Sequence, residues 1–530
     1  MRSGGIRSNR WSIIAGSILL ALLVGLVPPA VLAQEGGESP WSAPIPLSVT
    51  TPTSWFPDIA VDPAGRVHVV WDSQYWAEYS DEGYDNVMYT RLDEQGWWLP
   101  LDVVFVNTRG AITRPAIAVD ASSNIHLLNI GGGNVGFRYR KVPADMASVA
   151  VAWSNSRRMD EMVYMSDIEI DQEGIIHVVY DRAVPHNPED EPPRQEGEPR
   201  IPEYIADIFY RQSRDGGETW SEPYDLFPTP LTGDARAQLE IDARGTLHVA
   251  WDAGWDRRTL YGEPQYGVYV NSQDGGLTWS KPYTIAYPAR TNAQLAVGAD
   301  GKGGVLLVWR ATDRQEIFYT WSRDDGLTWT RPMTIPNFFA RRWTIPFDAY
   351  DMEADSAGRI HLVAVGQTQI PASRADFVPL GVYHLVWDGR RWSEPEPIAV
   401  YPEDRFPEYP KLDISQGNQL HVVWFVRDNL WQLGEYQVWY SSRTVDAPTR
   451  LPPPTPTPTP GPTATPTPTI TPTATPMPPI WSKAAMDRRA IYTENDDVAD
   501  LLLSLSPLGL IVLGLWGARR WKRRHSSRLR

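Results

Sequence analysis

The residues of this 530-residue chain that are best suited to hold a charged group are arginines at recurring positions. Four stand just before the first strand of a unit that repeats along the chain, and a fifth ends the second strand of one unit. They are Arg114, Arg236, Arg290 and Arg405, with Arg310 as the fifth. If the repeats surround one axis, several of these guanidinium groups converge and could bind an anionic group through paired hydrogen bonds. The alternative is that each arginine balances charge on an acidic surface.

Histidine recurs as well, once per unit in six units, just after a turn. The six are His68, His126, His177, His248, His361 and His421. Imidazole is a common metal ligand, but one histidine per unit separates the rings, so we expect structural hydrogen bonds. The chain has no cysteine, which excludes disulfides, thiolate metal sites and cysteine nucleophiles. We therefore expect no metal and no cofactor.

These side chains are carried by a unit that recurs seven times, roughly every 50 to 70 residues. Its first half is an apolar strand, a turn with Asp and Gly, and a second strand with His followed by aliphatic and aromatic residues. Residues 58–71, DIAVDPAGRVHVVW, are the first copy, and the others begin near residues 116, 167, 238, 294, 351 and 411. Alternating apolar residues and tight-turn residues indicate antiparallel strands.

The second half is a strand with tyrosine, a turn, and Trp-Ser-x-Pro. Three copies are fuller: SRDGGETW at 213–220, SQDGGLTW at 272–279 and SRDDGLTW at 322–329. The residues concerned are Ser213, Asp215, Gly217, Thr219, Trp220, Ser272, Asp274, Gly276, Thr278, Trp279, Ser322, Asp324, Gly326, Thr328 and Trp329. They resemble the Asp box, Ser-x-Asp-x-Gly-x-Thr-Trp, of the sialidase (BNR-repeat) superfamily. The resemblance implies a structural role, in which the aspartates accept backbone N–H groups, the glycines adopt positive φ and the tryptophans pack between units.

Four strands per unit and seven units predict an all-β, seven-bladed β-propeller over residues 41–447. The seventh unit lacks a Trp-Ser-x-Pro strand of its own, and residues 41–47, WSAPIPL, supply this pattern near the other end. We expect this N-terminal strand to close the ring, which removes an exposed sheet edge. Blades that each need large aromatic planes also account for the 24 tryptophans.

The resemblance also implies where a ligand would bind. Sialidases hold a sugar carboxylate with three arginines and use a Tyr/Glu nucleophile and an Asp acid/base. The longest loops opposite the Asp boxes are 72–85, 181–205 and 252–265, and loops on a rigid scaffold often carry function. The Tyr/Glu pair is not identifiable. Arg200-Ile201-Pro202 resembles the family's Arg-Ile-Pro motif, but it lies in the third unit instead of at the start of the ring.

Both ends of the chain have the composition of membrane-targeting segments. Residues 1–33 predict a signal peptide with cleavage after Ala33, an uncleaved anchor being the alternative. Residues 448–479 alternate Pro and Thr and predict a disordered, extended stalk, followed by a polar spacer at 480–500. Residues 501–518 predict one transmembrane helix, and the basic tail at 519–530 predicts a cytoplasmic C-terminus.

Without the two basic ends the remainder carries 39 basic and 64 acidic residues, a net charge of −25 against −15 for the whole chain. Such a surface repels phosphate backbones, so we expect no nucleic-acid partner. The sequence predicts a single-pass cell-membrane protein with an extracellular propeller that binds a carbohydrate or protein ligand. The alternatives are an exo-sialidase-type glycoside hydrolase and a non-catalytic envelope scaffold.

Overall fold

The computed structural model describes residues 40–450, apart from 50–52, 77–82, 107–112, 132–135, 186–188, 190–202, 230–231, 255–263, 286–291, 342–349, 374–376 and 429–434. In this part the fold is all-β, as predicted, with two short 3₁₀ helices, η1 (Ala144–Met146) and η2 (Ala150–Trp153). The expected signal peptide, transmembrane helix, spacer and tail, and all but residues 448–450 of the stalk, lie outside the described residues. No helix among the described residues is long and apolar enough to span a membrane.

Five sheets of the described chain have four antiparallel strands each. They are β7 (Ala116–Val119), β8 (Asn124–Gly131), β9 (Gly136–Pro143) and β10 (Ser156–Asp160); β11 (Val163–Ile170), β12 (Ile176–Pro185), β13 (Tyr204–Ser213) and β14 (Tyr224–Asp225); β15 (Gly233–Ile241), β16 (Leu247–Gly254), β17 (Tyr266–Ser272) and β18 (Tyr283–Ile285); β19 (Asn292–Ala299), β20 (Val305–Ala311), β21 (Glu316–Ser322) and β22 (Met333–Phe339); and β23 (Tyr350–Ala354), β24 (Ile360–Gly366), β25 (Leu380–Trp387) and β26 (Glu396–Tyr401). Each sheet is one propeller-like blade, with its strands paired in chain order.

The sixth sheet has nine strands and joins the two ends of the described chain. It contains β27 (Phe406–Ser415), β28 (Gln419–Arg427), β29 (Tyr436–Thr444), β1 (Ile45–Pro46), β2 (Thr53–Val61), β3 (Val67–Trp76), β4 (Gly83–Asp93), β5 (Gly96–Trp97) and β6 (Leu101–Val106). Strand β1 pairs antiparallel with β29, and a parallel bridge joins β29 to β2. The prediction that residues 41–47 complete the last unit is confirmed by this pairing.

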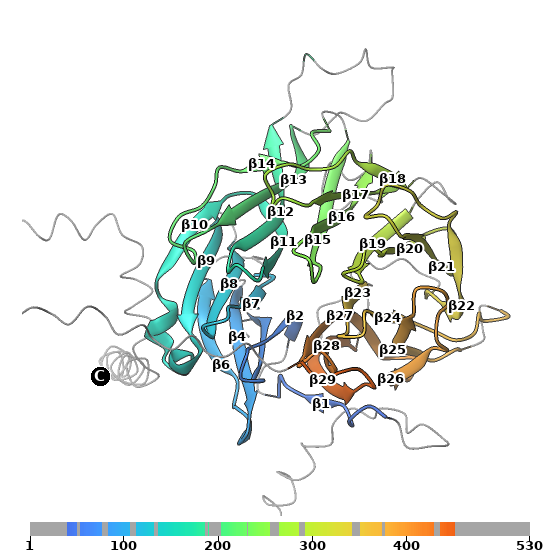
Figure 1. Ribbon diagram of the computed structural model, residues 1–530. Coiled ribbons are helices and arrows are strands. Elements are labelled where there is room, and N and C mark those ends of the chain that lie inside the picture. Colours follow the sequence, from blue (N-terminus) through green and yellow to red (C-terminus); the bar gives the residue numbers. More distant parts are fainter. Residues whose placement is uncertain are drawn as a thin grey trace, which may run out of the picture.

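The first strands of the units lie innermost and form a closed series (Figure 1). Among the described residues, β2 contacts β7, and the contacts continue through β11, β15, β19, β23 and β27 back to β2. Neighbouring sheets pack face to face and bury aromatic side chains between them. Trp71, Trp251, Trp309 and Trp424, at equivalent points of second strands, are at most 1% exposed. Large rings at repeated positions therefore fill the wedge between one sheet and the next.

The turn after each inner strand is held by its first residue. Asp62 Oδ1 accepts the backbone N–H groups of Ala64 and Arg66, both at 2.9 Å, and Gly65 adopts φ +80°. The register pairs Ile176, after such a turn, with Ser213, which begins an Asp box. The two kinds of turn thus lie on one face, which we call the turn face. The opposite end of the ring, where second and third strands connect, is the loop face.

Candidate functional site

The inner strands carry a bulge near the loop face. The register shifts by an extra residue at this point in β2, β15, β19 and β27, and a non-glycine residue there has positive φ. These residues are Phe56 (φ 48°), Arg236 (60°), Gln294 (61°) and Tyr409 (52°), and Arg114 (34°) holds the equivalent place before β7. Positive φ is costly for side chains with a Cβ, so each bulge needs support from its surroundings. The bulges aim five dissimilar side chains at the same end of the ring.

Arg114 is buried between two aromatic rings from neighbouring sheets. Its guanidinium carbon lies 3.6 Å from the ring centroid of Tyr164 and 4.9 Å from that of Phe56. Its Nη1 also donates to the carbonyl oxygen of Tyr164 at 3.1 Å. With only 6% of the residue exposed, Arg114 joins three sheets through cation–π contacts.

Arg236 lies at the mouth of the central cavity and is paired to a carboxylate. Its Nη2 lies 2.6 Å from Asp252 Oδ2, and its backbone N–H donates to Asp181 Oδ2 at 3.2 Å. Asp181 Oδ1 accepts the N–H groups of Tyr164 and Met165, which supports the inner strand next to Arg236. Burial raises the pKa of Asp181, although these hydrogen bonds oppose the shift.

The other predicted arginines that the structure describes do not join Arg236 at the mouth of the cavity. Arg310, at 0% exposure, donates from Nη2 to the carbonyl oxygen of Arg341 at 2.8 Å. Arg405 is half-buried in the turn between β26 and β27, where its backbone N–H donates to Pro402. Arg290 lies outside the described residues. Among the predicted arginines that the structure describes, Arg236 alone lines the mouth of the central cavity.

The cavity runs along the axis and has a volume of about 230 Å³. Two positions on the inner strands, two residues apart, supply most of its polar lining. The position nearer the loop face holds Asp58, Asp167, Gln238, Asp351 and Lys411, and the next holds Glu169, Glu240, Glu353 and Asp413. Seven carboxyl groups therefore surround one lysine in the described lining. The sequence contains a signal for this site, since polar residues alternate with apolar ones in the inner strands, but we did not identify it from the sequence.

Four of the carboxylates tie one inner strand to the next. Asp58 Oδ2 accepts the N–H of Ile117 at 2.8 Å, and Asp167 Oδ2 accepts that of Leu239 at 3.0 Å. Asp351 and Asp413 make the same contact with Leu412 and Val61, at 2.8 and 2.5 Å. Burial raises the pKa of Asp58 to about 7 and those of Asp351 and Asp413 to about 6.

The three glutamates have no comparable backbone contact in the described structure. Glu353 Oε2 has no hydrogen-bond partner there. Burial, followed by repulsion from neighbouring carboxylates, raises the pKa values of Glu169, Glu240 and Glu353 well above the usual range. The carboxyl oxygens of these side chains face the cavity and are not used in hydrogen bonds that hold the fold together.

Lys411 is the cation at the centre of this lining. Its Nζ lies 3.9 Å from Asp351 Oδ1. Burial opposes its charge, but Asp351, Asp167 and Asp58 more than offset that effect and raise the pKa of Lys411 well above its usual value. The lysine stays protonated and partly neutralises Asp351, Asp167 and Asp58, which lie at the position nearer the loop face.

The mouth of the cavity on the loop-face side has a different chemistry. It shares Asp167, Gln238 and Lys411 with the axial cavity and adds other polar and aromatic groups. They are Ser166, Arg236, Asp252, Gln294, Tyr350 and Tyr409. Gln238 Nε2 donates to the carbonyl oxygen of Tyr350 at 2.7 Å, and burial raises the pKa of Tyr409 to about 12. Tyrosine rings and amide groups around a concave site can bind a polar ligand with flat apolar faces.

The Asp boxes have the structural role that their resemblance implies. In the first, Asp215 Oδ1 accepts from Ser213 Oγ at 2.9 Å and from the N–H of Thr219 at 2.8 Å. The boxes at 272–279 and 322–329 repeat these bonds through Asp274 and Asp324. Their tryptophans pack edge-on against tyrosines of the preceding sheet, at centroid distances of 5.0–5.2 Å for Tyr139–Trp220, Tyr210–Trp279 and Tyr269–Trp329.

The six recurring histidines are held in the same network. Each histidine Nδ1 lies 2.7–2.9 Å from a partner in its own sheet, which is Tyr89, Tyr139, Tyr210, Tyr269, His384 or Tyr440 in chain order. For His177 the opposite nitrogen, Nε2, lies 3.2 Å from Asp171 of the turn. The described residues contain no group of three or more His, Asp or Glu side chains arranged to hold a metal ion.

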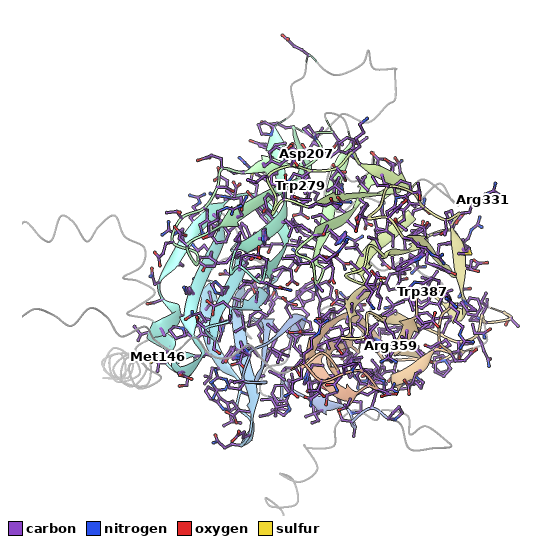
Figure 2. The ribbon with its side chains drawn as sticks, in the orientation of Figure 1. Met146, Asp207, Trp279, Arg331, Arg359 and Trp387 are labelled. Carbon is purple, nitrogen blue, oxygen red and sulfur yellow. The ribbon has the colours of Figure 1, made fainter. Side chains whose placement is uncertain are left out.

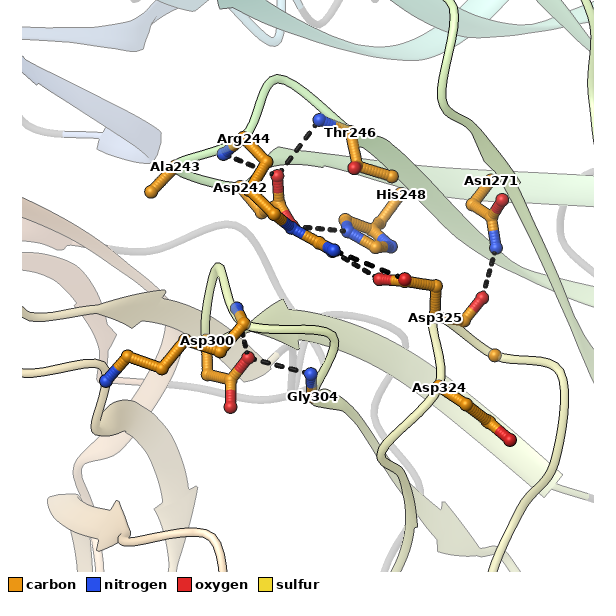
Figure 3. Close-up of polar contacts among 12 residues, drawn as sticks. Asp242, Ala243, Arg244, Thr246, His248, Asn271, Asp300, Gly304, Asp324 and Asp325 are labelled. Carbon is orange, nitrogen blue, oxygen red and sulfur yellow. Dashed lines mark hydrogen bonds and ion pairs between the residues drawn. The ribbon is translucent and has the colours of Figure 1, made fainter.

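Figure 3 shows how the turn face joins neighbouring sheets. Asp242 holds its own turn by accepting the N–H groups of Arg244 and Thr246, both at 2.9 Å. Arg244 bridges Asp242 to Asp325, which lies in the Asp box of the next sheet. Asn271 Nδ2 donates to the carbonyl oxygen of Asp325 at 2.7 Å.

Residues 201–422, which include all three Asp boxes, match the family described as BNR repeat-like domain. Over these residues the chain is similar to the BNR-repeat proteins of the sialidase superfamily. The predicted resemblance is thereby confirmed. No curated protein sequence matches the chain.

Several solved structures resemble the BNR-repeat chain at low identity. The NanB sialidase from Streptococcus pneumoniae is 14% identical, with a TM-score of 0.42 over 80% of this chain and 72% of that chain. The intramolecular trans-sialidase from Ruminococcus gnavus is 12% identical, with a TM-score of 0.39 over 75% and 95%. A protein of unknown function from Dyadobacter fermentans is 14% identical, with a TM-score of 0.40 over 76% and 99%.

The described residues do not bring three arginines together at one ligand site, as a sialidase would require. The sialidase expectation asks for three arginines on one ligand, whereas Arg114 and Arg310 are engaged inside the protein and Arg236 pairs with Asp252. The residues 200–202 that resemble the family motif lie outside the described part. What the structure does bring together at the axis is a set of carboxyl, amide and tyrosine groups.

Proposed function

We propose that this chain is a cell-surface BNR-repeat protein whose seven-bladed propeller binds a carbohydrate without hydrolysing it. The extracellular display, the stalk and the single C-terminal membrane helix rest on the sequence alone. The seven-blade assignment is supported by the closed series of inner strands and by the division of the nine-stranded sheet at the parallel bridge between β29 and β2.

The observation that carries the proposal is the axial cavity beneath the mouth. Glu169, Glu240 and Glu353 offer oxygens that accept hydrogen bonds from sugar hydroxyls, and Tyr409 offers a ring at the entrance. A volume of about 230 Å³ lies below the usual range for drug-sized ligands, which favours a single sugar ring entering the axis.

The charge of the lining selects the kind of sugar. Burial keeps the three glutamates protonated, so the charge of the lining comes from its four aspartates and one lysine. The aspartates outnumber the lysine and Arg236 is paired to Asp252, so the lining disfavours an anionic sugar. We therefore favour a neutral glycan end over a sialic acid. The same argument favours binding over an exo-sialidase-type reaction, for which the arginines would have to release their present partners.

The proposal is tested by glycan binding to the purified full chain in detergent. Glu240→Ala is expected to lower affinity for a neutral sugar at least about tenfold, because it removes a hydrogen-bonding group that no fold contact uses. Glu218→Ala, at an exposed Asp-box position, is the matched control and keeps the affinity. Equal affinity in both variants contradicts the proposed site.

A fluorogenic sialoside separates the catalytic alternative. We expect no turnover by the full chain. Turnover that disappears in Arg114→Ala or Arg236→Ala would establish the hydrolase instead. Absence of binding to every glycan, together with retention in an envelope complex, would support the scaffold.

A further inference from the structure

A polar groove lies on the turn face, between the sheet of β7–β10 and the Asp box of the next sheet; we call it the Lys141 groove. Its lining comes from β9, from the start of β10 and from that Asp box, and consists of Tyr139, Arg140, Lys141, Asn155, Ser156, Arg157, Gly216, Gly217 and Glu218. The groove has a volume of about 330 Å³ and shares none of these residues with the axial cavity or its mouth. Figure 2 labels Met146, which lies between β9 and β10 in the chain, at the left of the ring.

Three side chains of the described lining are cationic and one is anionic. The register pairs Tyr139 with Arg157, and Lys141 lies two residues further along β9, so Lys141 and Arg157 project from the same face of the sheet. Diagonal neighbours of this kind lie about 7–8 Å apart, within reach of long side chains. Two cations at this separation repel each other, and an anion between them reverses the sign of the interaction.

The fold needs a hydrogen-bond donor at the position of Lys141, but it does not need a charge there. Lys141 Nζ donates to the carbonyl oxygen of Gly216 in the Asp box at 3.1 Å. Asn271 holds the same register position in the sheet of β15–β18, and its Nδ2 donates to the equivalent carbonyl, that of Asp325, at 2.7 Å. Gln212 holds the position in the sheet between them. A neutral amide therefore suffices for the fold, and the lysine adds a positive charge and two further N–H groups.

The one carboxylate of the lining compensates this charge weakly. Glu218 Oε2 lies 3.9 Å from Arg157 Nη2, and the two side chains are 76% and 48% exposed. Exposed ion pairs of this kind contribute little and are easily exchanged. The other two Asp boxes have Leu277 and Leu327 at the position of Glu218, so the fold does not require this carboxylate. Arg140 donates from Nε to the carbonyl oxygen of Trp153 at 2.9 Å and adds positive potential from a fixed place.

We propose that the Lys141 groove binds an oxyanion, a sulfate or carboxylate group, between Lys141 and Arg157. The guanidinium group offers paired N–H donors to such a group, and the ammonium group offers a compact charge opposite them. Without its two basic ends the chain carries a net charge of −25, so a cationic groove contrasts with the rest of its surface and concentrates anions locally. A free anion and an acidic sugar share this chemistry. The site lies on the face opposite the axial mouth and is independent of the neutral-sugar site proposed there.

Titration calorimetry of the full chain in a neutral detergent at low ionic strength tests the site. Sodium sulfate and glucose 6-sulfate are the probes, and sodium chloride controls for ionic strength. Lys141→Gln is expected to lower the affinity for both probes at least about tenfold, because it removes a charge-assisted hydrogen bond. The variant should fold, since Gln212 holds the same position in the next sheet. Arg157→Gln, at an exposed position, is expected to have a similar effect.

Lys302→Gln is the matched control. Lys302 is exposed, and its Nζ also donates to a carbonyl oxygen of the next sheet, that of Ala357, at 2.8 Å, so its loss removes the same charge without touching the groove. Tighter binding of glucose 6-sulfate than of sulfate supports an acidic sugar as the ligand, and equal affinity supports a free anion. No binding of either probe, or equal losses in the Lys141 and Lys302 variants, overturns the proposal. Glu240→Ala should keep the affinity for sulfate, which separates this test from that of the axial site.

Discussion

The turn face and the axis bury polar groups in opposite ways. On the turn face most units repeat one network, in which an aspartate holds its turn and a histidine bonds a tyrosine. In the unit of β11–β14 the next sheet covers that tyrosine. Along the axis the same strand position holds Asp58, Ala116, Asp167, Gln238, Ala296, Asp351 or Lys411 in chain order. A polar group that the fold requires is repeated and paired. Glu169, Glu240 and Glu353, two residues further along the inner strands, occur in only some units and have no backbone contact in the described structure, so they are available for a ligand.

The two regions also respond to pH with opposite signs. Although burial opposes it, hydrogen bonds from His68 and Arg66 hold the pKa of Asp62 at about 2, so this carboxylate stabilises the fold above its unfolded pKa. Asp58 has a folded pKa of about 7, so it weakens the fold as the pH rises. Acid therefore weakens the turn face, and alkali weakens the axis.

The largest expected effect tests whether both regions depend on a closed ring. Deletion of residues 41–47 removes β1 and the buried Trp41, which is 4% exposed and lies edge-on to His384. The free energy of unfolding is expected to fall by about 5 kcal/mol or more, since loss of a buried tryptophan alone costs about 3–5 kcal/mol. Thermal and denaturant unfolding measure the change. Deletion of residues 34–39 serves as the control, and an unchanged melt of the 41–47 deletion refutes closure by this strand.

The second prediction tests the close contact between Gly276 and Tyr210 on the turn face. A Cβ on Gly276 would lie 2.0 Å from the hydroxyl oxygen of Tyr210, and the glycine has φ +82°. Gly276→Ala is therefore expected to destabilise by about 3 kcal/mol, combining overpacking with backbone strain. Gly245→Ala is a matched control, because Gly245 has φ +79° and nothing within 4 Å of its Cβ position. The control should lose only about 1 kcal/mol, and equal losses would show that the tyrosine contact is unimportant.

The smallest expected effect is a gain in stability, in contrast to the losses above, and it concerns the axial residue Asp58. The unfolded chain ionises Asp58 near pH 3.8, whereas the folded chain keeps its proton to about pH 7, so stability falls across that window as pH rises. Asp58→Asn keeps an acceptor for Ile117 without this charge. It is expected to leave stability unchanged at about pH 4 and to raise it by about 1–3 kcal/mol at about pH 8.

Asp62→Asn is the counterpart on the turn face. Its loss of stability should be full above pH 3.8 and should shrink as the pH falls toward about 2. Chemical denaturation at each pH measures both variants. The same pH trend in the two variants would remove the distinction between the regions.

Sequence periodicity predicted the strands, the Asp-box turns and the pairing of the two ends because each depends on local chemistry that recurs. Alternation marks strands, Asp and Gly mark turns, and WSAPIPL fills a missing pattern. The structural role of the histidines followed from their spacing, and the structure adds their tyrosine partners.

The site was less predictable because it depends on which side chains meet across sheets. Arg114 was expected at a ligand but is sandwiched by Tyr164 and Phe56, and no local pattern encodes that contact. The axial carboxylates are visible as alternating polar residues, yet their convergence needs the ring to be closed.

The closing strand has a consequence for the order of folding. Ser42 bonds Ser441 across 399 positions, so the strand that is synthesised first receives its partner last. Until β29 has been made, residues 41–47 have no edge to pair with, and the first inner strand has no final neighbour. Closing so long a loop is slow and leaves strand edges unpaired in the meantime. We expect ring closure to be the late step of folding and the nascent chain to need protection from aggregation until its last strand arrives.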